Sequence, residues 1–151
     1  MMEAWRKIRL GDACVTNADS YSPKEEWKFV NYLDTGNITD NRIDSIQYID
    51  VENDKLPSRA RRKVKKDSII YSTVRPNQRH FGIIKTQPEN FLVSTGFAVI
   101  DVDANVLNAD FLYYLLTQPT LVETLHAIAE QSTSAYPSIK PVSYTHLTLP
   151  T

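Results

Sequence analysis

The feature that most constrains the fold is a change of hydrophobic period after residue 102. Residues 68–74 (S-I-I-Y-S-T-V), 81–85 (F-G-I-I-K) and 91–102 (F-L-V-S-T-G-F-A-V-I-D-V) are rich in β-branched and aromatic residues, which is typical of strands. Beyond Asn108 the apolar residues recur at helical spacing instead. Strands followed by helices, with no repeated β-α-β unit, predict an α+β domain with a mixed, mostly antiparallel β-sheet and a C-terminal helical segment.

Capping and turn residues mark where the predicted strands and helices begin and end. Asn108 is a favourable N-cap for a helix over residues 109–117, and Pro119 suits the first turn of a second helix. Residues 28–33 and 44–51 are predicted as earlier strands, with a tight turn between them that gives Gly36 or Asn37 a positive φ. Residues 91–102 are predicted as one long strand that bends at Gly96.

The composition fits one globular domain. The chain has 151 residues, of which 42% are hydrophobic, and no apolar run approaches the roughly 20 residues that a membrane span needs. The first ten residues contain no apolar stretch that would suit a signal peptide. Cys14 is the only cysteine, which excludes a disulfide within the chain and a thiolate metal cluster. These observations predict a cytoplasmic protein with no membrane partner.

The charge is distributed unevenly. Residues 55–85 contain ten Lys and Arg against one acid, a net charge of +9, while the other residues carry seven basic and seventeen acidic side chains, a net charge of −10. Six of the nine residues in the run S-R-A-R-R-K-V-K-K (58–66) are cationic. An isolated basic run is often only a solvated surface, but such asymmetry also indicates an anionic partner.

The loop that follows this run carries the chemistry of base recognition. The sequence R-P-N-Q-R-H (75–80) lies between two predicted strands, and Pro76 disfavours a helix there. Lysine and arginine neutralise DNA phosphates, Asn and Gln pair with adenine edges, and Arg pairs with guanine. A loop of this kind, held by two strands beside a basic run, is suited to the DNA major groove. The aromatic residues Tyr71, Phe81 and Phe91 are predicted to pack in the core rather than stack on bases.

Catalytic motifs are sparse. The chain contains no phosphate-binding loop, dinucleotide-binding glycine pattern, nucleophile elbow or N-P-P-Y motif, and His80 and His126 lack metal-ligand spacing. The segment Glu26-Trp27-Lys28, with Asp12 or Asp19 upstream, has the carboxylate and lysine pattern of many metal-dependent nucleases. The same spacing is common in charged sequences, so we predict no catalytic residues and no metal site.

Several segments together resemble one known family. The chain is similar to the target recognition domain of the specificity subunit of type I restriction–modification systems over essentially residues 5–141. The segments that carry this resemblance are Y-L-D-T-G-N-I (32–38), S-R-A-R-R-K-V-K-K (58–66), I-I-Y-S-T-V-R-P-N (69–77), F-G-I-I (81–84) and V-S-T-G-F-A-V-I (93–100). The opening W-R-K-I-R-L-G-D, the helical F-L-Y-Y-L-L-T and the loop S-T-S-A-Y-P-S-I-K-P support it. Family members usually carry Gly-Asp before the I-I-Y-S strand, where this chain has Asp67-Ser68, so the geometry of that turn is left open.

The resemblance implies a non-catalytic reader of double-stranded DNA. Such a domain recognises one half of a split target, while methyltransferase and restriction subunits bring S-adenosylmethionine, ATP and magnesium, so no cofactor is expected on this chain. We predict phosphate contacts from five residues of the basic run: Arg59, Arg61, Arg62, Lys63 and Lys65. Base contacts are predicted from four residues of the following loop: Arg75, Asn77, Gln78 and Arg79. A second contact loop is predicted at Gln131, Ser132, Thr133 and Tyr136.

Other functions stay open from the sequence. The chain could be the recognition domain of a single-chain restriction–modification enzyme. A metal-dependent nuclease would use Asp12, Glu26 and Lys28, and a protein-interaction module would bind a partner without steep dependence on salt.

The last ten residues, V-S-Y-T-H-L-T-L-P-T (142–151), resemble a translated sequencing adapter. The transposase-end adapter used in library preparation yields these residues in order from GTC-TCT-TAT-ACA-CAT-CTG-ACG-CTG-CCG-ACG. We therefore predict that residues 1–141 form a recognition domain cut before its spacer helix, and that residues 142–151 are a non-native tail.

Overall fold

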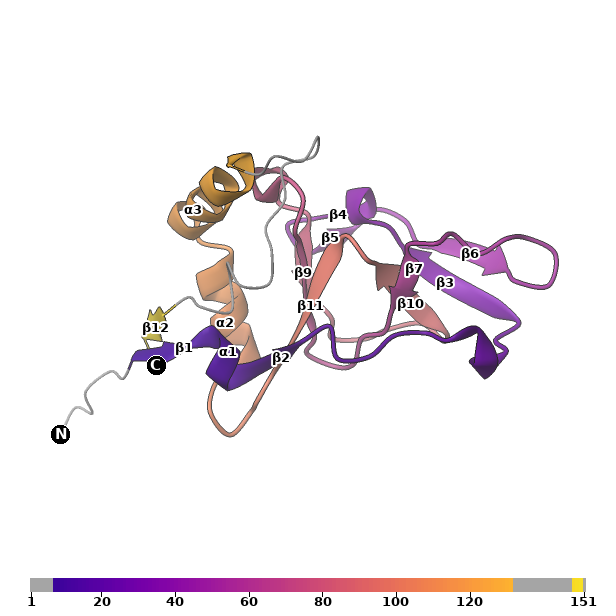
Figure 1. The fold of residues 1–151 in the computed structure, drawn as a ribbon, viewed down its shortest axis with the longest axis horizontal. Coiled ribbons are helices and arrows are strands. Elements are labelled where there is room, and N and C mark those ends of the chain that lie inside the picture. Colours follow the sequence, from indigo (N-terminus) through magenta and orange to yellow (C-terminus); the bar gives the residue numbers. More distant parts are fainter. Residues whose placement is uncertain (1–6, 132–147, 151) are drawn as a thin grey trace.

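Two four-stranded sheets and a helical pair dominate the computed structural model, which describes residues 7–131 and 148–150 (Figure 1). The first sheet has the strand order β6 (Gln47–Asp50), β3 (Phe29–Leu33), β10 (Phe91–Ser94), β7 (Ala60–Arg62). The second sheet has the order β2 (Cys14–Thr16), β11 (Phe97–Val102), β8 (Ile69–Ser72), β9 (Phe81–Ile83). The strand pair β10–β3 is parallel and the other pairs of these sheets are antiparallel. The predicted α+β class, with mixed and mostly antiparallel sheets, is confirmed.

Smaller elements complete the described chain. Helix α1 (Leu10–Ala13) precedes β2, and β4 (Ile38–Thr39) forms a hairpin with β5 (Arg42–Ile43). The 3-10 turns are η1 (Pro23–Glu25), η2 (Thr35–Asn37) and η3 (Pro76–Gln78). The helical pair is α2 (Ala109–Leu116) and α3 (Pro119–Glu130), and β1 (Lys7–Arg9) pairs with β12 (Thr148–Pro150).

The hydrophobic core explains the long apolar runs of the sequence. Along β8, Ile69 and Tyr71 pack on one side with the helices, while Ile70 packs on the other side with residues of both sheets. A strand that is covered on both faces needs apolar residues at every position, because successive side chains point in opposite directions. Tyr71, Phe81 and Phe91 are all buried, as predicted.

The helices begin where the sequence predicted. The Asn108 side chain accepts a hydrogen bond from the Phe111 N–H at 2.9 Å, and Pro119 occupies the first turn of α3. Leu112 and Leu116 of α2 are buried against the second sheet. The Tyr71 hydroxyl donates to the Leu116 carbonyl at 3.0 Å, which joins β8 to the end of α2.

One strand prediction is wrong. Residues 91–102 form two strands, β10 and β11, which belong to different sheets. The chain breaks at Thr95–Gly96 because the backbone groups there bond to two different neighbours. The Thr95 N–H donates to the Arg59 carbonyl at 2.9 Å, while the Gly96 carbonyl accepts from the Thr73 N–H at 2.9 Å.

The predicted positive φ at Gly36 or Asn37 is also wrong. Those residues form the 3-10 turn η2, which needs no left-handed residue, and the Asp34 carboxylate accepts from the Thr35 N–H at 2.8 Å. The left-handed residues lie just beyond, at Asp40 and Asn41, with φ values of 46° and 66°. Two consecutive positive φ values are what a type I′ turn, a common two-residue hairpin connection, requires.

The turn before β8 differs from the family pattern in sequence but has a clear geometry. Asp67 has a φ of 69°, which a glycine adopts without strain and which aspartate tolerates better than most residues. The Lys85 ammonium bonds to the Asp67 carboxylate at 2.7 Å, and the buried Ser68 hydroxyl donates to Asp101. These contacts stabilise the left-handed turn without a glycine.

Candidate nucleic-acid interface

The loop between β8 and β9 presents polar side chains to solvent. Its centre is η3, with Pro76 buried and Asn77 and Gln78 exposed. Arg75 and Arg79 flank η3 with φ values of 47° and 60°, so both lie in the left-handed region. We call residues 73–80 the reader loop. The predicted base-contacting residues are therefore brought together on one short, ordered turn.

Arg59 and Arg62, at the two ends of the β7 segment, lie close to the start of this loop. Strand alternation leaves Ala60 buried and Arg61 exposed. The Arg62 guanidinium donates to the Thr95 carbonyl at 3.3 Å, and a Cβ placed on Gly96 would lie 2.7 Å from an Arg59 guanidinium nitrogen. Arg59 and Arg62 thus meet at the Thr95–Gly96 turn.

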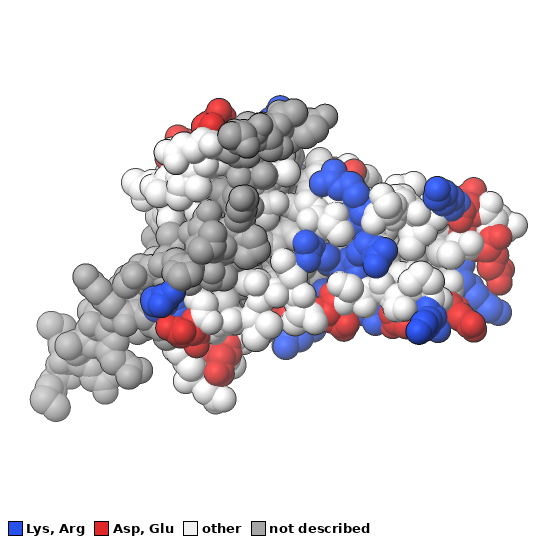
Figure 2. Space-filling view, viewed as in Figure 1, with Lys and Arg blue, Asp and Glu red and all other residues white. Residues whose placement is uncertain are grey.

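Thr73 connects that turn to the reader loop. Its N–H and its hydroxyl both donate to the Gly96 carbonyl, at 2.9 Å and 3.1 Å. Arg75 follows two residues later. Figure 2 shows Lys and Arg atoms gathered on the face above β7 and β11, where these contacts place the basic run and the loop side by side.

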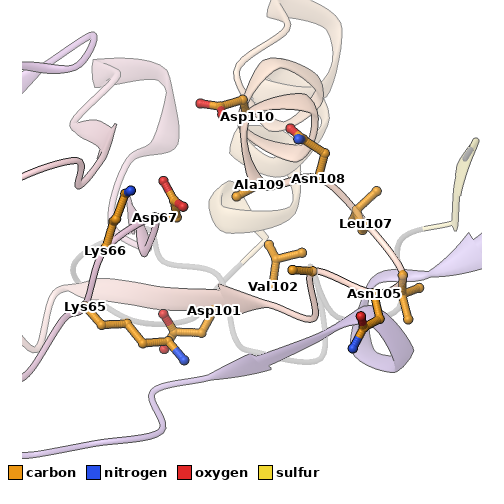
Figure 3. Close-up of a pocket in the computed structure, with 12 residues that line it drawn as sticks. Lys65, Lys66, Asp67, Asp101, Val102, Asn105, Leu107, Asn108, Ala109 and Asp110 are labelled. Carbon is orange, nitrogen blue, oxygen red and sulfur yellow. The ribbon is translucent and has the colours of Figure 1, made fainter.

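Two predicted phosphate contacts lie elsewhere. Lys63 forms an ion pair with Glu25 and lies 5.3 Å from the centre of the Trp27 ring. Lys65 precedes Ile69, the first residue of β8, whereas the reader loop follows Ser72, the last residue of that strand. Lys65 therefore lies near the end of β8 where Ile69 pairs with Ile100, away from the reader loop. It borders a pocket of about 560 Å³ below the start of α2, where Figure 3 shows it beside Asp101. The predicted phosphate set is therefore divided among three places: the Thr95–Gly96 turn, the Glu25 ion pair and the pocket at the start of α2.

The Glu25–Lys63 pair has a defined pH dependence. The hydrogen bond from Lys63 lowers the pKa of the Glu25 carboxyl, and the same bond raises the pKa of Lys63. A carboxyl whose folded-state pKa is lowered stabilises the fold above its unfolded pKa of about 4.3, and this stabilisation is lost as the pH falls through the folded value.

We expect Glu25→Gln to lower the melting temperature slightly at pH 7. Glutamine keeps the helix-capping geometry of Glu25, whose carboxylate accepts from the Ser22 N–H at 2.8 Å, so the variant removes mainly the charge. Thermal melts of both chains from pH 7 to about pH 2 check this, because the difference should vanish at the acid end. A difference that persists at low pH would contradict the pairing.

The second predicted contact loop is described at one residue only. Gln131 is exposed and caps the C-terminal end of α3. Turn η3 packs against α3, and Figure 1 shows that it lies near the C-terminal end of that helix. Ser132, Thr133 and Tyr136 lie outside the described residues. Gln131 therefore shares one end of the molecule with the reader loop.

Sequence reasoning missed the β4–β5 hairpin, whose turn contacts the reader loop. The Asp40 carboxylate accepts from Arg79 Nε at 2.6 Å, and the Asn41 side-chain oxygen accepts from the Ile83 N–H at 3.0 Å. The dipeptide Asp40-Asn41 was the available signal, because these two residue types tolerate positive φ in two-residue hairpin turns.

The described residues offer no support for metal chemistry. Among residues 7–131 and 148–150, no group of three or more His, Cys, Asp or Glu side chains could hold a metal ion. Asp12 belongs to α1, whereas Glu26 ends η1 with a φ of 54°. Within the same part of the chain, no helix is long and apolar enough to cross a membrane.

Comparisons with known proteins identify the family. The model of the family described as "Type I restriction modification DNA specificity domain" matches residues 2–150, so the chain belongs to this family of DNA specificity domains. The type I restriction enzyme HindI specificity subunit of Haemophilus influenzae is 29% identical over 148 residues, which are 98% of this chain and 32% of that protein. The family resemblance seen in the sequence is confirmed.

Solved structures share the fold. A chain from a study of complex assembly and conformational transition of the type I R-M system matches with a TM-score of 0.81 and 25% identity, over 99% of this chain and 38% of that one. The HsdS subunit from Thermoanaerobacter tengcongensis matches with the same TM-score and 24% identity over the same shares. The chain thus spans about a third of the length of these relatives.

Proposed function

We propose that this chain reads one half of a split double-stranded DNA target for a type I restriction–modification enzyme. The observation that carries the proposal is the convergence at Thr95–Gly96. Arg59, Arg62 and the start of the reader loop meet there, so cations suited to phosphates lie at the base of the loop whose tip exposes Asn77 and Gln78. Family membership supports the same role.

The proposed division of roles follows exposure. Arg61 is exposed on β7, where it is suited to a phosphate, and Arg59 and Arg62 are its close neighbours in the chain. Asn77 and Gln78 are exposed at the tip of the reader loop and are suited to base edges. Lys63 must exchange Glu25 for a phosphate if it contacts DNA.

The chemistry belongs to other subunits in this proposal. The chain itself is non-catalytic, a methyltransferase subunit supplies S-adenosylmethionine, and a restriction subunit uses ATP and magnesium. The chain's own residues bind and orient the duplex.

The first experiment is selection of bound duplexes from a library of randomised double-stranded DNA by the full 151-residue chain. Enrichment of a short defined sequence is the expected result, and it should persist in competing non-specific DNA. Recovery of random sequences only would contradict the proposal.

Two variants then separate the proposed roles. Asn77→Ala is expected to lose preference at one base position by about tenfold, because one base contact is removed. Arg61→Ala is expected to weaken binding to all sequences alike and to lower the slope of log affinity against log salt by about one, because one phosphate contact is lost. Affinities of both variants for the selected duplex and its single-base substitutions, over a salt series, provide the test. Identical behaviour of the two variants would contradict the assignment.

A further inference from the structure

The Arg79 side chain, which the sequence predicts to contact a base, is held by the protein. Its Nε donates to the Asp40 carboxylate at 2.6 Å and one terminal nitrogen donates to the Thr117 carbonyl at 3.4 Å. Its guanidinium carbon lies 4.9 Å from the centre of the Phe81 ring. These partners belong to the β4–β5 turn, the end of α2 and β9. The guanidinium therefore connects three separate elements.

The β4–β5 turn provides a fixed anchor for this arginine. The Asp40 N–H donates to the Arg79 carbonyl at 2.9 Å, so the two residues are joined through backbone and side chain together. The Asn41 N–H donates to the Phe81 carbonyl at 2.9 Å, and the Asn41 side chain accepts from Ile83. The hairpin is thus bonded to the residues that leave the reader loop.

The reader loop needs such an anchor because its backbone is strained. Arg75 and Arg79 have φ values of 47° and 60°, a region that is unfavourable for residues with a Cβ. Strain of this kind persists only where the surrounding contacts fix the conformation. Asn77 and Gln78 lie between these two residues, so their direction depends on both ends of the turn.

The geometry points to Arg79 as a positioning residue, anchored by Asp40, that holds Asn77 and Gln78 in the orientation for base recognition. This inference rests on the proposed function and changes the role expected for Arg79. A side chain that spans Asp40, Thr117 and Phe81 sets the exit of the loop, and it reads no base itself.

The charge of Asp40 supports this role. A carboxylate on a DNA-facing surface repels phosphates, which lowers affinity for every sequence. Its side chain is 50% exposed, and it neutralises the arginine it holds. A pair with no net charge adds little to phosphate binding, whereas it does fix the loop.

Asp40→Gly separates the two roles of Arg79. Glycine accepts the φ of 46° at this position, so the hairpin turn is retained while the carboxylate is removed. If Arg79 is a positioning residue, the preference for the selected duplex over its single-base substitutions falls by about tenfold at the positions that Asn77→Ala and Gln78→Ala also affect. If Arg79 reads a base, releasing it from Asp40 leaves this preference unchanged or sharper.

Asp44→Gly is the matched control. Asp44 is exposed beyond the same hairpin, so this variant removes one negative charge from that region without touching Arg79. Both variants are expected to bind random duplexes more tightly, but only Asp40→Gly is expected to lose sequence preference. The melting temperature of each variant is measured to check that the variant is folded.

Arg79→Lys provides a second readout, because lysine keeps the charge but not the planar fork. The positioning role predicts the same pattern of lost preference as Asp40→Gly. Lost preference at one position in Arg79→Lys, together with full preference in Asp40→Gly, would overturn the inference while the proposed function stands. A wild-type chain that selects no sequence would overturn both.

Discussion

Replacing Phe81 by alanine is expected to lower the free energy of unfolding by about 3–5 kcal/mol, the range for removing a buried aromatic side chain. Phe81 is 1% exposed and lies in the cluster that joins the second sheet to the helices. Its ring centre is 5.2 Å from that of Tyr71, in a stacked pair, and 6.1 Å from that of Tyr113, edge to face. The cavity left by the variant would lie directly beneath the reader loop.

Thermal and urea unfolding check this expectation. For a chain of this length the loss corresponds to a fall of about 10 °C in the melting temperature. Phe81→Leu is the matched control, because it keeps most of the apolar volume and should cost clearly less. If Phe81→Ala and Phe81→Leu unfold alike, or if the alanine variant loses under 1 kcal/mol, the ring does not have the packing role described.

The sequence predicted most elements because their signals are local. Asn108 caps α2 through its own side chain, and Pro119 starts α3, so both boundaries depend on neighbouring residues alone. Residues 91–102 could not be divided in the same way. Strand β10 and the first four residues of β11 are buried, and the short interruption Ser94-Thr95-Gly96 is compatible with a bend inside one strand as well as with a break between two. Only the long-range bonds to Arg59 and Thr73 reveal the break.

Prediction of the candidate site from the sequence was also limited by long-range contacts, which no local pattern shows. The reader loop and the basic run were visible as composition, and the structure brings Arg59 and Arg62 of that run to the turn that Thr73 also contacts, while Lys63 and Lys65 lie elsewhere. Charge counting could not show which cations already have partners. Lys63 pairs with Glu25, 38 residues away, and Arg79 pairs with Asp40, 39 residues away. Both acids precede the basic region in the sequence, so no local pattern connects them to it.

Gly82 marks a close approach that its sequence context did not show. It is buried in β9, and a Cβ placed on it would lie 2.6 Å from the Ile38 side chain and 2.9 Å from the Asn41 side-chain oxygen. Atoms at such distances overlap, so the Ile38 and Asn41 side chains, or the backbone that carries them, must shift. The glycine allows the β4–β5 hairpin to lie directly on β9, where Asp40 reaches Arg79.

Gly82→Val is therefore expected to destabilise the fold by about 3 kcal/mol, the upper end for overpacking a well-packed core. Gly36→Val is the matched control, because no atom lies within 4 Å of a Cβ at that exposed position and its φ is not positive. The free energy of unfolding of Gly36→Val should differ from that of the unchanged chain by no more than about 0.5 kcal/mol. Urea unfolding of both variants measures the difference. If the two substitutions lower the free energy of unfolding equally, the contact between the hairpin and β9 is looser than the structure shows. If only Gly82→Val is costly, the hairpin is fixed against the strand that ends the reader loop.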